Sequence, residues 1–133
     1  IPHCHSMFGE ASGNGAVPID NPFIRRVLAR AAINDEVADV LCRRQVWADV
    51  EGIHDISYGP MAKMFTTETM YRDASAIVEA GAPGSLVRGV DPDMDYVETT
   101  MRRAIAMTVY GGTSEVHRSL IAEKSLGMPK SRS

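Results

Sequence analysis

Apolar residues recur at helical spacing in four segments of the chain. These segments cover residues 20–51, 60–80, 93–110 and 114–126. A recurrence every three or four residues places the apolar side chains on one face of an α-helix, and no alternation typical of a β-strand persists anywhere. The sequence therefore predicts an all-α fold, most simply an antiparallel four-helix-bundle-like domain with short connections.

The first helix has a clear start and a clear end. Asp20 and Asn21 offer a capping side chain directly before Pro22, and Gly52 ends the segment. About 30 residues of helix extend over about 45 Å, so we expect neighbouring helices of similar length to cover its apolar stripe. The expected stripe consists of Ile24, Val27, Leu28, Ala31, Val37, Val40, Leu41, Trp47 and Val50.

Turn residues also delimit the later helices. We expect the second helix to begin near Ser57 and to stop before Gly81, and the carboxylate of Asp93 or Asp95 to cap the third. The fourth is expected from Ser114 to Leu126. The predicted inward residues are Met61, Met64, Phe65, Met70, Ala74, Ile77 and Val78 of the second helix, Tyr96, Val97, Thr100, Met101, Ala104, Ile105 and Thr108 of the third, and Val116, Leu120 and Ile121 of the fourth.

The first 19 residues differ from the rest of the chain. They have no periodicity and are rich in Gly, Ser and Pro, so we expect a linker or arm over residues 1–19 and one domain over residues 20–133. His3, Cys4 and His5 carry side chains that bind zinc or copper, but three ligands within three residues do not easily form a tetrahedral site. We therefore expect no metal site. The other cysteine, Cys42, has no Cys-x-x-Cys partner and is expected to be a small buried residue of a protein from a reducing compartment.

Composition narrows the class of protein. The 133 residues include 14 Lys and Arg and 17 Asp and Glu, giving a formal net charge of -3 with both signs interspersed. No basic stripe indicates nucleic acid, no apolar run approaches the roughly 20 residues that span a bilayer, and no signal peptide is recognisable. We expect a cytoplasmic protein. The first residue is Ile rather than Met, which indicates that the chain is part of something longer.

The junction between the third and fourth helices is the candidate site. Gly111 and Gly112 are expected to end one helix, and Thr113 or Ser114 to accept a hydrogen bond from the first turn of the next. Free backbone N–H groups and the positive end of a helix dipole favour an anion at such a place, and glycine allows a ligand to come close. By itself, however, a junction of this composition more often only turns the chain.

The residues of this segment resemble a known family. Residues 110–118 read Tyr-Gly-Gly-Thr-Ser-Glu-Val-His-Arg and are followed by Ile-Ala-Glu-Lys at 121–124 and Leu-Gly-Met-Pro at 126–129. This run resembles the carboxyl-terminal signature of the acyl-CoA dehydrogenase family, with His117 where Gln is usual. Residues 60–68, Pro-Met-Ala-Lys-Met-Phe-Thr-Thr-Glu, resemble a helix of the same domain. The resemblance implies that the chain covers most of the carboxyl-terminal bundle, without the amino-terminal helical domain and the middle β domain.

The resemblance also implies an activity. Family members use FAD to introduce an α,β double bond into an acyl-CoA thioester, and they pass the electrons on, commonly to electron-transferring flavoprotein. The resemblance places Gly112, Thr113 and Glu115 near FAD, and Tyr110 and Gly111 beside the acyl-CoA. In one large branch the catalytic base is a Glu at the position of Gly111, which cannot accept a proton, so no catalytic residue is assigned.

Several interpretations stay open on the sequence alone. The chain is expected to be a carboxyl-terminal fragment of an acyl-CoA dehydrogenase subunit that is inactive alone and works in a homo- or hetero-oligomer. In the heteromeric arrangement, a partner subunit supplies the base. The alternative is a non-catalytic helical assembly module. The acyl chain length, and the choice between fatty acyl and steroid side-chain substrates, are not predicted.

Overall fold

The computed structural model describes residues 18–89 and 92–130, and within these ranges the chain is helical without any strand. This confirms the predicted all-α class. The proposed arm at residues 1–19 lies almost entirely outside the described residues. The α-helices are α2 (Pro22–Val50), α3 (Tyr58–Ala80), α4 (Pro92–Met107) and α5 (Ser114–Leu120). Shorter segments are the 3-10 helices η1 (Pro18–Asp20) and η2 (Gly84–Leu86) and the π-helical turn η3 (Ile121–Ser125).

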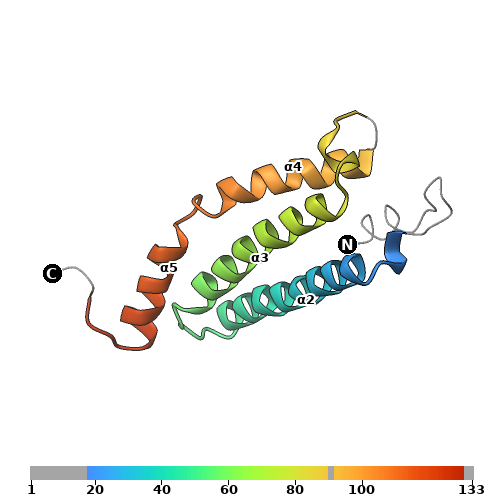
Figure 1. Cartoon of the computed structure of the whole chain (residues 1–133). Coiled ribbons are helices and arrows are strands. Elements are labelled where there is room, and N and C mark those ends of the chain that lie inside the picture. Colours follow the sequence, from blue (N-terminus) through green and yellow to red (C-terminus); the bar gives the residue numbers. More distant parts are fainter. Residues whose placement is uncertain (1–17, 90–91, 131–133) are drawn as a thin grey trace.

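Three of the helices lie side by side in alternating directions. Figure 1 shows α3 between α2 and α4, with α5 beyond the end of α4 and close to the first turns of α3. α3 is therefore the central element, because it packs against all the other α-helices that are described. The bundle is three helices wide along most of its length, and α5 closes one end.

A side-chain cap marks the start of α2, and side-chain hydrogen bonds order the loop directly before α3. The side chain of Asn21 accepts a hydrogen bond from the N–H of Phe23 at 2.9 Å, which confirms the predicted start of α2. Before α3, Asp55 accepts hydrogen bonds from the N–H and the hydroxyl of Ser57, at 2.9 and 2.7 Å. These two bonds are the largest causes that lower the pKa of Asp55. Ser125 also donates to Asp55, at 3.2 Å, so the loop between α2 and α3 is tied to the end of η3.

Asp95, one of the two predicted capping residues, lies inside α4, which begins at Pro92. The carboxylate of Asp95 accepts hydrogen bonds from the N–H of Gly89, at 2.9 and 3.1 Å, and so ties the preceding loop to the helix. A second tie comes from the buried Glu98, which pairs with Arg88 of the loop at 2.8 Å and with Arg102 one turn on. Hydrogen bonds from these two guanidinium groups lower the pKa of Glu98. The loop before α4 is thus held by carboxylates from within the helix.

The hydrophobic core is small and lies toward the first half of α2. It consists of Ile24, Val27, Ala31, Ile77, Val78 and Val97. The second half of the predicted α2 stripe is exposed, with Val40 at 62%, Trp47 at 50% and Val50 at 78%. The expectation that neighbouring helices cover this whole stripe is wrong here, because Val40 and Trp47 lie on the side of α2 away from Ile24 and Ala31 of the core. Cys42 is exposed as well, contrary to the prediction that it is buried.

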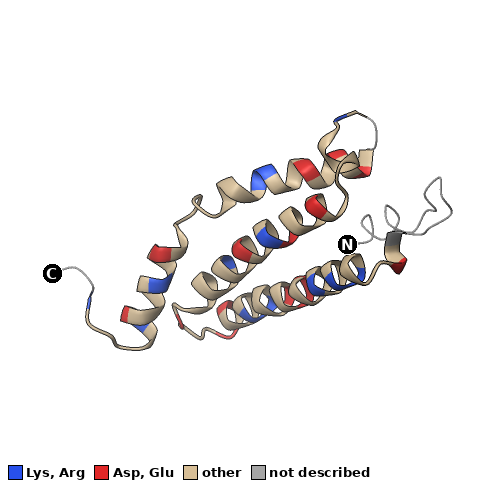
Figure 2. Cartoon of the chain, viewed as in Figure 1, with Lys and Arg blue, Asp and Glu red and all other residues tan. Residues whose placement is uncertain are grey.

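Charged side chains are spread over all four α-helices. Figure 2 shows both acidic and basic groups on each of these helices, and along α4 the acidic groups come first and the basic ones follow. Both signs of charge therefore occur on every described α-helix, as the mixed charges of the sequence predict. None of the helices in the described part of the chain is long and apolar enough to cross a membrane.

Candidate functional site

The turn between α4 and α5 has the backbone that the glycines predict. Gly111 and Gly112 both have positive φ, +72° and +105°, which residues with a Cβ rarely adopt. The N–H of Tyr110 still bonds to the carbonyl of Ala106 at 2.9 Å, so the helical turn ends directly before the glycines. The side chain of Tyr110 is 80% exposed and stands away from the core. The glycines therefore let the chain change direction abruptly and leave Tyr110 on the outside.

The start of α5 is capped by Thr113, one of the two candidates. Its hydroxyl oxygen accepts a hydrogen bond from the N–H of Val116 at 3.4 Å, whereas Ser114 is buried in the first turn. The carboxyl of Glu115 has a lowered pKa, first because of a hydrogen bond from its own backbone N–H and second because of the Thr113 hydroxyl. Glu115 is therefore held as a carboxylate at the opening turn of α5, where the helix dipole also favours a negative charge.

Residues of α3 hold this turn in place. The ammonium group of Lys63 donates a hydrogen bond of 2.6 Å to the carbonyl oxygen of Gly112, and Arg118 of α5 pairs with Glu68 at 2.7 Å. Lys63 and Glu68 both belong to segment 60–68, whose resemblance to the family is independent of the glycine motif. The structure shows why the two stretches occur together, because one side of α3 fixes both the turn and the first part of α5.

His117 is the least expected member of the site. In the sequence it is only an exception to the family pattern, yet it is 8% exposed, whereas Val116, predicted to point inward, is 50% exposed. A Cβ on Gly112 would lie 3.1 Å from Nε2 of His117, closer than ordinary contact. Neither ring nitrogen has a hydrogen-bond partner among the described residues. The buried face of α5 is thus rotated by one residue relative to the prediction, and it is His117, rather than Val116, that lies beneath the glycine turn.

The predicted site residues share one short stretch but differ in exposure. Tyr110, Gly111 and Glu115 are exposed, and Gly112 and Thr113 are half-buried. Nothing lies within 4 Å of the place that a Cβ on Gly111 would take, so the space beside this residue is open. The site therefore presents backbone and hydroxyl groups next to an exposed aromatic ring, with one carboxylate at position 115.

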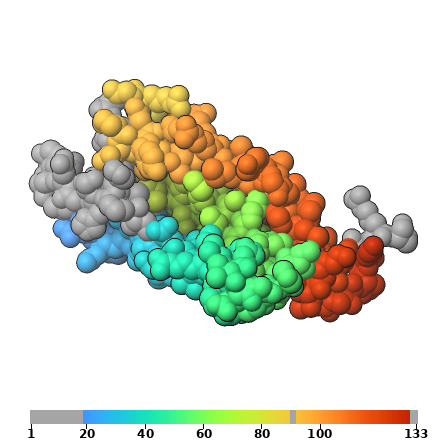
Figure 3. All heavy atoms as spheres, turned by 180° about the vertical axis from the view of Figure 1, so that it is seen from behind, coloured from blue at the N-terminus to red at the C-terminus, as the bar shows by residue number. Residues whose placement is uncertain are grey.

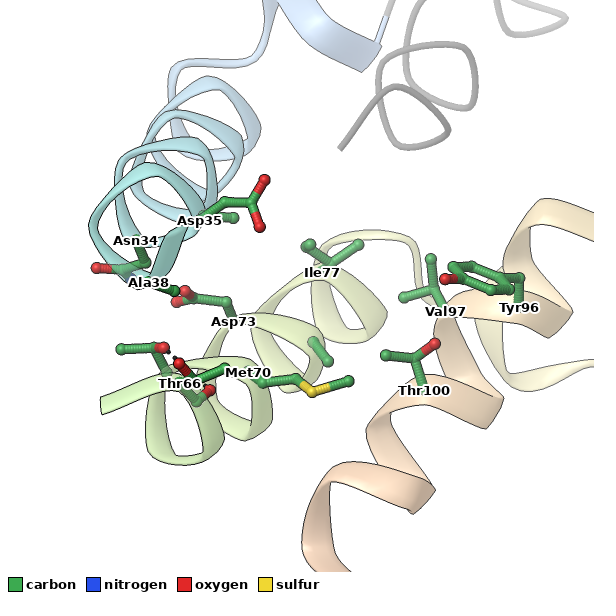
Figure 4. A pocket seen from close by; sticks show the side chains of 13 residues that line it. Asn34, Asp35, Ala38, Thr66, Met70, Asp73, Ile77, Tyr96, Val97 and Thr100 are labelled. Atoms are coloured by element: carbon green, nitrogen blue, oxygen red, sulfur yellow. Dashed lines mark hydrogen bonds between the residues drawn. The ribbon is translucent and has the colours of Figure 1, made fainter. Parts of the chain in front are cut away.

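A groove between α2 and α4 is not among the features that the sequence predicts. Its volume is about 270 Å³. Figure 3 shows α3 recessed between the other two helices, and Figure 4 shows the side chains that line the groove. At its centre the buried Asp73 accepts hydrogen bonds from Asn34 at 2.6 Å and from Arg30 at 3.2 Å. The sequence feature that could have indicated this groove is a pair of polar residues, at positions 34 and 73, that interrupt the apolar stripes of α2 and α3. Small residues lie around them. The predicted site residues do not line this groove.

No cluster of metal-binding side chains occurs in the described ranges 18–89 and 92–130. His3, Cys4 and His5, the three candidate metal ligands of the sequence, lie outside the described residues.

Comparisons with known proteins point in one direction. The family model described as "Acyl-CoA dehydrogenase, C-terminal domain" matches residues 1–126. Acyl-CoA dehydrogenase FadE26 of Mycobacterium tuberculosis is 30% identical over 125 residues, an alignment that covers 84% of this chain and 30% of FadE26. A chain in the crystal structure of the ChsE4-ChsE5 complex from Mycobacterium tuberculosis has the same fold, with a TM-score of 0.83 and 23% identity over 98% of this chain and 35% of that one. The chain thus spans about a third of the length of these relatives.

Proposed function

The chain belongs to the acyl-CoA dehydrogenase family through the carboxyl-terminal domain of that family, and on this basis we propose that it serves FAD-dependent α,β-dehydrogenation of an acyl-CoA thioester. On this proposal it is the carboxyl-terminal part of a longer subunit, and it is inactive alone because the flavin and thioester sites need other domains. The observation that carries the proposal is the glycine turn fixed by α3, since it joins both family-like stretches in one local structure.

The residues at the turn fit FAD. The backbone N–H of Gly112 and the hydroxyl of Thr113 are neighbouring groups that can donate hydrogen bonds to a phosphate. Glu115 is kept ionised by a lowered pKa and suits a ribose hydroxyl as a hydrogen-bond acceptor. When bound, FAD would supply the hydride acceptor, while this chain would contribute binding and orientation.

Tyr110 and Gly111 would border the acyl-CoA. The exposed ring of Tyr110 offers an apolar surface with a polar tip, and the open space beside Gly111 leaves room for the substrate. Gly111 has no group that can accept the α-proton, so the base has to come from another part of the parent subunit or from a partner.

A heteromeric assembly is a second form of the same proposal. Gly111 supports it, because a subunit without this carboxylate benefits from a partner that has one. The structural neighbour belongs to a complex of two different proteins, ChsE4 and ChsE5. We propose a cytoplasmic homo- or hetero-oligomer that passes electrons to electron-transferring flavoprotein. Fatty acyl and steroid side-chain thioesters are both candidate substrates.

The test uses the full-length parent subunit, expressed alone and together with any dehydrogenase subunit encoded beside it. We expect bound flavin in the purified protein, measured by absorbance, and bleaching of the flavin band when a suitable acyl-CoA is added without oxygen. A series of fatty acyl and steroid side-chain thioesters would identify the substrate class. A parent that is free of flavin in both preparations would instead support the non-catalytic assembly module.

A further inference from the structure

The groove between α2 and α4 is faced by three helices but filled by none of them. On α3 the lining residues recur at spacings of three and one, which is one continuous side of a helix. They are Thr66, Thr69, Met70, Asp73, Ala74 and Ile77. Figure 4 shows Asp35 of α2, Met70 of α3 and Thr100 of α4 pointing toward the same space. α2 and α4 each pack against α3 but hardly contact each other within the described residues, so this side of α3 stays uncovered between them.

The dimensions of the groove suit an α-helix. Its lining extends from Thr66 to Ile77 along α3, which is about 16 Å or three helical turns. Small lining residues such as Ala31, Ala38 and Ala74 let another backbone come close. An extended segment would bring unpaired backbone N–H and C=O groups into the groove, because residues 18–89 and 92–130 contain no strand edge that could pair with them. A helix pairs these groups internally and presents only its side chains to the groove.

The charges of the groove specify one property of its occupant. Asp73 at the floor already accepts hydrogen bonds from Asn34 and Arg30, at 2.6 and 3.2 Å. Asp35 is exposed and has no hydrogen bond or ion pair with another described residue. Among the described residues, no Lys or Arg lines the groove. A helix with an apolar side and a Lys or Arg beside Asp35 would therefore match the groove in both shape and charge.

The polypeptide that precedes α2 joins the bundle at one end of this groove. Ile19 of η1 packs against the hydrophobic core, and three residues of that core, Ala31, Ile77 and Val97, also line the groove. Residues 1–17 connect this point to any preceding segment, and 17 residues can span up to about 55 Å. A helix located before residue 1 can therefore reach the whole length of the groove.

We propose that the groove is the docking site of an amphipathic α-helix that precedes residue 1 in the parent subunit and places a Lys or Arg beside Asp35. This rests on the proposed function only in that the chain is taken as part of a longer subunit. The covalent connection gives such a helix a high effective concentration at the groove. Association of two chains through the exposed Val40 and Trp47 would leave the groove open, because these residues lie on another side of α2.

Photo-crosslinking in the full-length parent identifies the occupant. Photo-methionine replaces Met70 with little change in size, and ultraviolet light links it to the residues that lie in the groove. We expect cross-links from position 70 to a segment before residue 1 of the same polypeptide. Co-assembly of isotope-labelled and unlabelled subunits separates links within one polypeptide from links between two. Met128, which is 54% exposed beyond η3, is the matched control and should not link to that segment.

Charge reversal tests the pairing with Asp35. Asp35→Lys should loosen the docked helix, and amide exchange over residues 66–77 of the parent should become about fivefold faster, as expected from the loss of an exposed ion pair. Glu36→Lys makes the same change at the next position, which is exposed but does not line the groove, and its exchange should stay within about twofold of the original. Replacing the cross-linked basic residue with Asp in the Asp35→Lys protein should restore slow exchange.

The opposite results would overturn the inference. Cross-links from position 70 to a second subunit or to residues 1–17 would give the groove another occupant, and links confined to α2, α3 and α4 would leave it empty. Equal exchange in Asp35→Lys and Glu36→Lys would refute the ion pair. None of these readouts uses the flavin. A flavin-free parent with the expected cross-links would refute the proposed function alone, whereas a flavin-containing parent without them would refute the docking alone.

Discussion

Two separate constraints act on Gly112. Its φ of +105° is costly for any residue with a Cβ, and the Nε2 of His117 lies only 3.1 Å from the place that such a Cβ would take. Gly111 shares the positive φ, +72°, but has open space around it. The two neighbouring glycines therefore differ in kind, one required by backbone and packing together and the other by backbone alone.

This difference predicts unequal effects of alanine. Gly112→Ala should destabilise the turn by about 1 to 3 kcal/mol through strain and contact with His117. Gly111→Ala is the matched control and should cost about 1 kcal/mol, because only the left-handed backbone is affected. Amide hydrogen exchange over residues 113–120 in the full-length protein measures the opening free energies. Equal effects of the two substitutions would contradict the packing role of Gly112.

The carboxyl of Glu115 predicts a pH dependence at the same turn. Its pKa in the folded state is lowered below 4.5 by its own N–H and by Thr113. The stabilisation is therefore fully present above about pH 4.5 and is lost as the pH falls through the lower folded value. Amide exchange in the first turn of α5, corrected for intrinsic rates, should show increased opening over this acid range. Glu115→Gln should remove this part of the pH dependence, and an unchanged profile in that variant would refute the assignment.

Among the helices, α3 organises the candidate site. Lys63 and Glu68 lie five positions apart on α3 and reach residues about 50 positions further along the chain. The two contacts are not equivalent. Lys63 is half-buried and donates a charged hydrogen bond to a backbone carbonyl, whereas the side chains of Glu68 and Arg118 are 41% and 54% exposed. Solvent screens the second contact much more strongly than the first.

Substitutions in α3 test this ranking. Lys63→Met keeps the aliphatic stem but leaves the Gly112 carbonyl unpaired, so the turn should lose about 1 to 3 kcal/mol of local stability. Glu68→Gln should cost less than about 1 kcal/mol, as expected for an exposed ion pair. Amide exchange over residues 111–120 provides both values. A larger effect of Glu68→Gln than of Lys63→Met would show that the ion pair, and not the lysine, holds α5.

Over the molecule as a whole, one uncovered row of apolar side chains lies on α2. Ile33, Val37, Val40 and Trp47 recur at spacings of four, three and seven, and each is at least 39% exposed. They lie on the side of α2 away from Ile24 and Ala31, so the core of this chain does not use them. A continuous apolar stripe of this kind is typical of a surface that other protein covers.

The stripe predicts self-association of the isolated chain. Sedimentation equilibrium should show oligomers, and the fluorescence of Trp47, the single tryptophan, should shift to the blue as concentration rises. Val40→Lys should weaken this association. Val46→Lys is the matched control, since Val46 is 61% exposed, against 62% for Val40, but lies on another side of α2. A chain that stays monomeric with a concentration-independent spectrum would show that the stripe is not an interface.

Features that depend on neighbouring residues follow from the sequence alone. Helical periodicity predicts the all-α class, and Asn21, Thr113 and the two glycines mark helix ends that the structure confirms. These features follow from local geometry, because caps and positive φ values involve residues only a few positions apart. The glycine stretch and segment 60–68 also point to the family through their residues, without any knowledge of how the helices pack.

Which faces are buried, and which distant residues meet, depends instead on the tertiary structure. The burial of His117 in place of Val116, the lysine contact to Gly112 and the groove around Asp73 all depend on how α3 lies against its neighbours. Periodicity defines an apolar stripe, but it does not say whether another helix of the chain covers that stripe. In this chain, the described helices leave the apolar residues in the second half of α2 exposed. The physical reason is that burial depends on contacts between residues about 40 to 50 positions apart, and the local pattern carries no information about these contacts.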